Sequence, residues 1–81
     1  MSASLRDLPL RVDAVVTHVE DAAAADPIAA RLRDLGFVAD EPVRLLARGP
    51  LGGDPLLVQV GTTRFELRRA EAARIRVRTQ A

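Results

Sequence analysis

The chain has 81 residues, of which 48% are hydrophobic and 28% are charged, and its formal net charge at pH 7 is +1. A chain of this length holds one hydrophobic core, so we expect a single domain over residues 1–81 and exclude a multidomain enzyme. Cysteine is absent and there is one histidine, which excludes a Cys/His zinc site, an iron–sulfur site, a thiol nucleophile and a disulfide framework.

Residues 11–20 are rich in β-branched side chains and predict the first strand. Apolar and polar residues alternate at first, but the alternation breaks where Val15 and Val16 are adjacent. This break predicts either a β-bulge or a strand that is buried on both faces near its end. No element is predicted before this strand, so Ser2 and Ser4 are expected in a mobile terminus.

A helix is predicted after Asp26, which offers an N-cap acceptor and is followed by Pro27 at the first helical position. Gly36 supplies the residue that ends a helix without a Cβ penalty, and we expect Phe37 to contact Leu32 in a Schellman motif. Apolar residues recur between these two signals at the i, i+4 and i+7 spacing, namely Ile28, Leu32 and Leu35. The helix is therefore predicted to be amphipathic and to need packing against the core.

The rest of the chain is predicted to form short strands separated by turns. In the first of these strands Val43, Leu45 and Ala47 are expected to share one face. Turn-forming residues are concentrated in 49–55, which predicts the loop of a long hairpin, and 69–73 predicts one helical turn before the last strand. The predicted strands cover residues 43–48, 56–60, 64–68 and 74–78.

Five short strands joined mostly by tight turns favour antiparallel pairing, because parallel pairing would need several crossover helices. A closed or partly closed barrel would also remove the exposed edges of such an apolar sheet. We therefore predict a mainly β fold, a small five-stranded barrel with one inserted helix at about 27–35 and a short helical turn before the last strand.

Four segments of the sequence carry a further signal through their order and spacing. They are Ala14-x-Val16-x-x-Val19, the helical segment Arg31-Leu32-x-x-Leu35-Gly36-Phe37, the loop Pro50-Leu51-Gly52-Gly53-Asp54-Pro55, and Phe65-Glu66-Leu67-Arg68-Arg69-Ala70-Glu71-Ala72-Ala73-Arg74-Ile75-x-Val77. Together they resemble the FeoA family of ferrous iron transport proteins over nearly the whole chain. The resemblance implies an SH3-like barrel in the bacterial cytoplasm that assists the membrane GTPase-permease FeoB and is not itself an enzyme.

The same module is fused to metal-dependent repressors, so the resemblance also leaves open a regulatory domain of that type. A small barrel that binds nucleic acid is a related alternative, because arginines are frequent in the last third of the chain. Base recognition in such proteins uses exposed aromatic side chains, however, and Phe37 and Phe65 are both expected in the core. We therefore expect no nucleic acid as a partner.

Active-site groups are nearly absent from the sequence. His18 is the only histidine, so it is also the only general base that could activate a serine in the manner of a triad. Gly52 and Gly53 are not followed by Gly-Lys-Ser/Thr and do not form a phosphate-binding loop. We expect a protein without catalytic activity.

His18 and Glu20 could offer an imidazole and a carboxylate to a divalent cation. A selective site needs three or four converging ligands, which this pair does not supply. The two side chains are therefore either ordinary surface residues at the end of a strand or ligands of an adventitious metal such as zinc. No cofactor is expected to be required.

The loop at 49–55 is the candidate surface for a partner. Leu51 stands between Pro50 and two glycines, and it is either an exposed apolar anchor or a side chain folded back over the end of the barrel. The arginines that follow are either solvated exterior or a docking surface for acidic residues. The residues that we expect to bind the partner are Leu51, Gly52, Gly53, Arg68 and Arg69.

The location of the protein follows from two absences in the sequence. No stretch approaches the roughly 18 consecutive apolar residues of a membrane helix, and the N-terminal residues show no export signal. We expect a cytoplasmic protein that is not inserted in the membrane and is held at the inner membrane through FeoB. Self-association through a barrel edge or the apolar loop is a further expectation.

Overall fold

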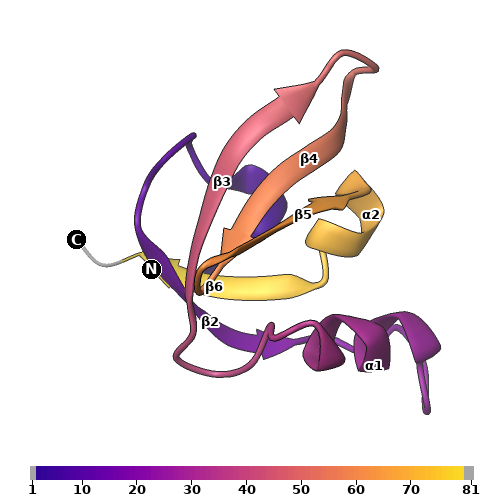
Figure 1. Cartoon of the computed structure of the whole chain (residues 1–81). Helices are drawn as coiled ribbons and strands as arrows, with labels where there is room; N and C mark the ends of the chain where they lie inside the picture. Colours follow the sequence, from indigo (N-terminus) through magenta and orange to yellow (C-terminus); the bar gives the residue numbers. More distant parts are fainter. Residues whose placement is uncertain (1, 80–81) are drawn as a thin grey trace.

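The computed structural model describes residues 2–79, and its strands pair antiparallel in the order β1-β6-β2-β3-β4-β5 (Figure 1). The mainly β class predicted from the sequence is confirmed. The elements in chain order are β1 (Ser2–Ser4), η1 (Leu5–Asp7), β2 (Ala14–Val19), α1 (Pro27–Asp34), β3 (Pro42–Gly49), β4 (Gly53–Val60), β5 (Thr63–Leu67), α2 (Arg69–Ala72) and β6 (Ile75–Thr79).

The sheet has six strands where the sequence predicts five, because β1 adds to the outer side of β6. The expectation of a mobile terminus at Ser2 and Ser4 is wrong. Ser4 is buried, and its Oγ donates to the carbonyl oxygen of Ala72 at 3.3 Å and accepts from the backbone N–H of Arg6 at 3.1 Å. A three-residue strand of small side chains carries no period-two signal, so only tertiary pairing defines it.

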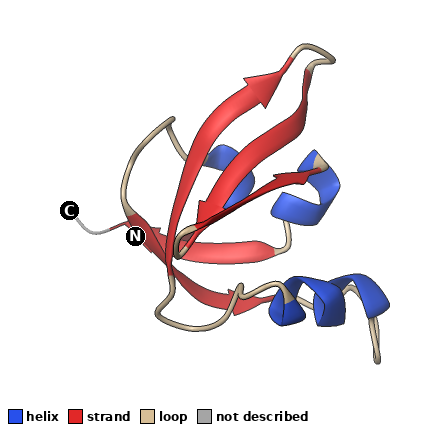
Figure 2. Ribbon diagram, in the orientation of Figure 1, coloured by secondary structure: helices blue, strands red, loops and turns tan. Residues whose placement is uncertain are grey.

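The strand pairing leaves the barrel open. Among the described residues β1 and β5 form the two ends of the sheet and do not pair with each other. Figure 2 shows the strands as one strongly curled layer with the helical segments at its margins. The fold is mainly β and its sheet is antiparallel as predicted, but the expected removal of sheet edges is not observed, and β5 remains an edge strand.

Two register shifts explain how the strands bury their side chains. In β2 the pairing with β6 shifts between Val16 and His18, and both Val15 and Val16 are buried, so a bulge and burial on both faces occur together. In β3 the pairing with β4 shifts between Leu45 and Ala47. Because a bulge changes the face of the residues that follow it, Ala47 is exposed, and the prediction that it shares the buried face is wrong.

The C-terminal end of α1 follows the predicted pattern. Gly36 has a φ of +114°, and the backbone N–H of Phe37 donates to the carbonyl oxygen of Leu32 at 3.1 Å, which is the Schellman bond. Leu32 and Phe37 are both fully buried. Ile28 is 39% exposed, whereas Ala29 is fully buried, so the prediction that Ile28 belongs to the buried stripe is wrong.

The core lies between the inner face of the curled sheet, η1 and α1. Phe37 is the largest fully buried side chain, and its ring centroid lies 6.2 Å from that of the partly buried Phe65. Phe37 is therefore a core residue, as predicted, whereas Phe65 is only partly buried and packs against the core. The remaining buried members of the cluster are Leu5, Leu8, Ala14, Val16, Val19, Ala29, Leu32, Val43, Leu45, Leu56, Val58, Val60, Leu67, Ala72, Ile75 and Val77.

Asp26 caps α1 as predicted and connects it to the rest of the fold. Its carboxylate accepts from the backbone N–H groups of Ala22 at 2.9 Å and Ile28 at 3.0 Å, and it forms an ion pair with Arg74. The hydrogen bond from Ala22 is the main cause that holds the pKa of Asp26 below its usual value of 3.8. Hydrogen bonds from the first turn of α1 and the charge of Arg74 act in the same direction, against the effect of burial.

We expect Asp26→Asn to lower the melting temperature at neutral pH and to flatten its dependence on pH. Because the folded pKa lies below the unfolded one, the charged carboxylate stabilises the fold above a pH of about 3.8 and loses this effect as the pH falls through the folded pKa. Thermal unfolding by circular dichroism at a series of pH values checks this, with the exposed Asp34→Asn as control. A gap between wild type and Asp26→Asn that stays constant down to strongly acidic pH would contradict it.

Candidate partner-binding surface

The loop between β3 and β4 forms a tight hairpin tip, residues 50–54, at the far end of the longest hairpin of the fold (Figure 1). The backbone N–H of Leu51 donates to the carbonyl oxygen of Asp54 at 3.2 Å, and the N–H of Asp54 donates back at 3.1 Å. The two residues between them, Gly52 and Gly53, have φ of +65° and +93°. Positive φ at both central positions is the requirement of a type I′ turn, so the glycines set the shape of the tip.

Leu51 is 73% exposed at this tip. The alternative in which it folds back over the end of the barrel is therefore wrong. Gly49 closes the base of the tip, because a Cβ at this position would collide with the carbonyl oxygen of Asp54. The hairpin tip thus presents one large apolar side chain on a turn whose positive φ angles the glycines permit and whose two backbone hydrogen bonds fix its conformation.

Arg69, which the sequence analysis places among the partner-binding residues, braces the hairpin tip. Its backbone N–H donates to Oδ1 of Asp54 at 2.7 Å, and its Nη1 donates to the carbonyl oxygen of Gly52 at 3.2 Å. Its Cδ lies 3.6 Å from the position that a Cβ on Gly53 would occupy. Arg69 therefore ties α2 to the hairpin tip, and the predicted residues from the two segments do meet in space.

A groove of about 490 Å³ lies between the hairpin tip and the two helices. Leu51 and Arg68 both line it, so this groove contains an apolar and a basic member of the predicted partner-binding residues. We call it the tip groove. Its lining residues are Arg31, Leu51, Pro55, Glu66, Arg68 and Glu71.

The charges along the tip groove are only partly paired. Glu71 accepts from the backbone N–H of Arg68 at 2.8 Å and forms an ion pair with Arg31 at 3.3 Å. Within residues 2–79 the guanidinium of Arg68 forms no ion pair, and it is exposed. The predicted partner-binding set does not include Arg31, because its contact with Glu71 joins residues 40 positions apart in the sequence and no local pattern encodes it.

His18 and Glu20 do not form a metal centre in this structure. His18 is exposed, and its Nδ1 lies 3.1 Å from Oγ1 of Thr17. Within residues 2–79 no group of three or more His, Cys, Asp or Glu side chains is placed to hold a metal ion. The hollow beside His18 is also lined by Arg33, whose guanidinium forms an ion pair with Asp21. Metal binding by these two residues stays a prediction.

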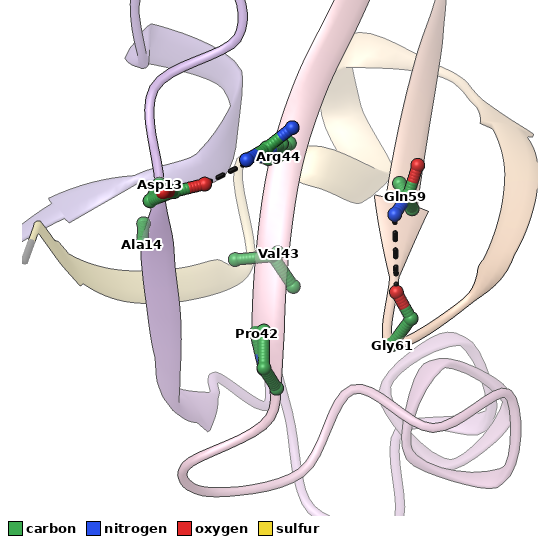
Figure 3. A pocket seen from close by; sticks show the side chains of 7 residues that line it. All are labelled: Asp13, Ala14, Pro42, Val43, Arg44, Gln59 and Gly61. Atoms are coloured by element: carbon green, nitrogen blue, oxygen red, sulfur yellow. Dashed lines mark hydrogen bonds and ion pairs between the residues drawn. The ribbon is translucent and has the colours of Figure 1, made fainter.

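A second cavity, of about 340 Å³, lies on the outer side of the sheet near the start of β2 and β3 (Figure 3). Its polar side chains are engaged with the protein itself. Arg44 donates to Asp13, which raises the pKa of Arg44, and Nε2 of Gln59 donates to the carbonyl oxygen of Gly61 at 3.1 Å. Because the donors and acceptors pair with one another, this cavity offers a ligand little that is not already satisfied.

The described residues 2–79 contain no helix with the length and apolar character that crossing a membrane requires.

The family-model match and several of the matching solved structures point to one family. The model of the FeoA domain matches residues 3–79 of this chain. The FeoA protein of Stenotrophomonas maltophilia, an SH3-domain protein solved in complex with zinc, is 59% identical, with 93% of this chain and 88% of that chain covered and a TM-score of 0.84. The FeoA protein of Chlorobium tepidum is 37% identical, with 96% and 70% covered and a TM-score of 0.80. No curated protein sequence gives a significant match.

A manganese-dependent transcriptional repressor shares the fold. It is 20% identical, with 96% of this chain and 36% of that chain covered and a TM-score of 0.82. At this identity the likeness shows the fold alone.

Proposed function

Since this chain belongs to the FeoA family, we propose that it is a non-catalytic accessory protein of ferrous iron uptake that binds the GTPase-permease FeoB through the hairpin tip and the tip groove. The observation that carries this proposal is Leu51, which is 73% exposed on a turn that two backbone hydrogen bonds and Arg69 hold in place. The Stenotrophomonas relative is described as a candidate activating factor of ferrous iron transport, which supports the same role here.

Leu51 supplies the affinity in this proposal. Complete burial of a leucine side chain contributes about 1.5–3 kcal/mol. The hairpin tip needs little ordering on binding, because its backbone bonds and the brace from Arg69 are already formed. An apolar side chain presented in this way is typical of an anchor that enters a pocket of the partner.

In this proposal the guanidinium of Arg68 orients the partner on the surface. Its guanidinium lines the same groove as Leu51 and has no ion-pair partner among the described residues. A carboxylate of the partner can accept two hydrogen bonds from such a group, which fixes its direction. Charge pairs at the rim of an interface affect the rate of association and specificity more than affinity. The partner segment that fits this surface is therefore an apolar pocket flanked by an acidic residue.

The test is titration of the purified chain against the cytoplasmic domain of FeoB and, separately, against duplex DNA and RNA by calorimetry. We expect saturable binding to the FeoB domain and none to nucleic acid. Binding to a duplex that weakens steeply as salt rises, with no binding to FeoB, would instead establish the repressor-type or nucleic-acid-binding alternative. The positions of the two aromatic rings argue against that alternative, because Phe37 is fully buried and Phe65 is partly buried against the core.

The same proposal places the protein in the cytoplasm, at the inner membrane only through FeoB, and without a required cofactor. Zinc bound to the Stenotrophomonas relative supports adventitious metal binding as a property of such surfaces. In this chain His18 and Glu20 are the residues we propose for it, as a weak and exchangeable site.

A further inference from the structure

Among residues 2–79 the strand β5 is an edge of the sheet, and its outer side has no strand partner. It pairs with β4 on one side, and within the described part of the chain no backbone hydrogen bond outside that ladder involves residues 63–67. An edge of this kind can add a strand from another chain, because its outward backbone groups are unpaired.

The backbone groups on that outer side belong to Arg64 and Glu66. In an antiparallel ladder the residues alternate between those bonded to the partner strand and those whose N–H and C=O groups point away from it. The two-residue turn Gly61-Thr62 joins the paired residues Val60 and Thr63, which fixes the alternation from the turn onward. Residues 63, 65 and 67 therefore direct their backbone N–H and C=O groups to β4. Arg64 and Glu66 direct theirs away from β4.

The side chains of the same two residues are exposed and of opposite charge. Neither Arg64 nor Glu66 forms an ion pair among residues 2–79. They flank Phe65, which is only partly buried and packs against the core from the edge. A twofold axis through Phe65 would therefore place Arg64 of each copy opposite Glu66 of the other copy.

We propose that β5 pairs with β5 of a second copy of this chain, antiparallel and in register about Phe65. Arg64 then lies opposite the partner's Glu66, and the same pair repeats on the other side of the axis. Both copies use the same patch, so the assembly closes as a dimer and does not extend into a filament. The other free edge, β1, has the sequence Ser-Ala-Ser and offers no such charge complementarity.

The dimer should be weak and reversible, because the shared strand is only five residues long. Its formation does not depend on the proposed binding to FeoB. It would have a consequence for that binding, however, because Glu66 also lines the tip groove. Two grooves would lie on either side of the twofold axis, and a dimeric partner could engage both at once.

The test is a charge-reversal set measured by sedimentation equilibrium over a wide range of concentration. Arg64→Glu and Glu66→Arg each place two pairs of like charges across the axis and are expected to weaken the dimer about tenfold or more. A mixture of the two single variants restores two opposite-charge pairs, as does the double variant R64E/E66R, and both are expected to associate like the wild type. Arg78→Glu is the control, because Arg78 is exposed on the inner strand β6 and forms no ion pair among residues 2–79.

A measurement on the unaltered chain completes the test. As the protein concentration rises, amide hydrogen exchange followed by NMR should show increasing protection of the backbone amides of Arg64 and Glu66. The amide of Phe65 already bonds to β4, so its protection should stay at the value of the monomer. A wild type that stays monomeric, single reversals that associate as well as the wild type, or protection that grows at β1 in place of β5 would each overturn the proposal.

Discussion

Phe37→Ala is expected to leave most of the chain unfolded at room temperature. Phe37 is fully buried where the C-terminal end of α1 meets the sheet, and truncation of such a phenylalanine costs about 3–5 kcal/mol. A core of this size without disulfides or metal supplies only about 3–5 kcal/mol of net stability. The loss therefore equals the whole stability of the fold.

Urea unfolding followed by far-ultraviolet circular dichroism measures this effect, since the chain has no Trp or Tyr to report by fluorescence. Ile28→Ala on the same helix is the control, and it should change stability by less than about 1 kcal/mol because Ile28 is 39% exposed. A Phe37→Ala protein that unfolds cooperatively with nearly wild-type stability would show that α1 does not hold the core together.

Leu51→Asp is expected to weaken binding to the cytoplasmic domain of FeoB by about 10- to 100-fold. The loss corresponds to the burial of one leucine side chain, with about 1.4 kcal/mol for each factor of ten. The melting temperature should stay nearly unchanged, because the side chain is 73% exposed and substitutions at such positions alter stability by about 0.5 kcal/mol or less.

Val38→Asp is the matched control for this binding measurement. Val38 is 44% exposed and lies in the loop between α1 and β3, far from the hairpin tip (Figure 1). The same chemical change there should leave binding intact. If the two variants bind FeoB equally, the hairpin tip is not the contact.

The elements with strong local signals could be predicted from the sequence. The helix boundaries follow from Asp26, Pro27 and Gly36, whose roles depend on neighbours within a few residues. The strand β6, with its strict period of two, follows in the same way. The misses arise where partners distant in the sequence decide the outcome. The bulge that exposes Ala47 depends on pairing with β4, and β1 exists only because β6 offers it an edge.

In the candidate surface, too, local features could be predicted from the sequence and contacts between distant segments could not. The sequence leaves the exposure of Leu51 open, since it does not determine whether a loop side chain turns back on the fold. The contact between Arg69 and the glycines of the hairpin tip cannot be predicted from sequence spacing. It arises because β5 brings the start of α2 next to the β3–β4 hairpin. The role of Arg69 as a brace is visible only from its bonds to Gly52 and Asp54.

The most direct measurement of the central claim is NMR shift mapping of the ¹⁵N-labelled chain during titration with the FeoB cytoplasmic domain. Saturable shifts concentrated at residues 50–54 and 68–71 are expected, because those residues form the hairpin tip and the start of α2 beside the groove. Shifts confined to the opposite end of the fold, or no shifts at saturating FeoB, would contradict the claim that this surface carries the function.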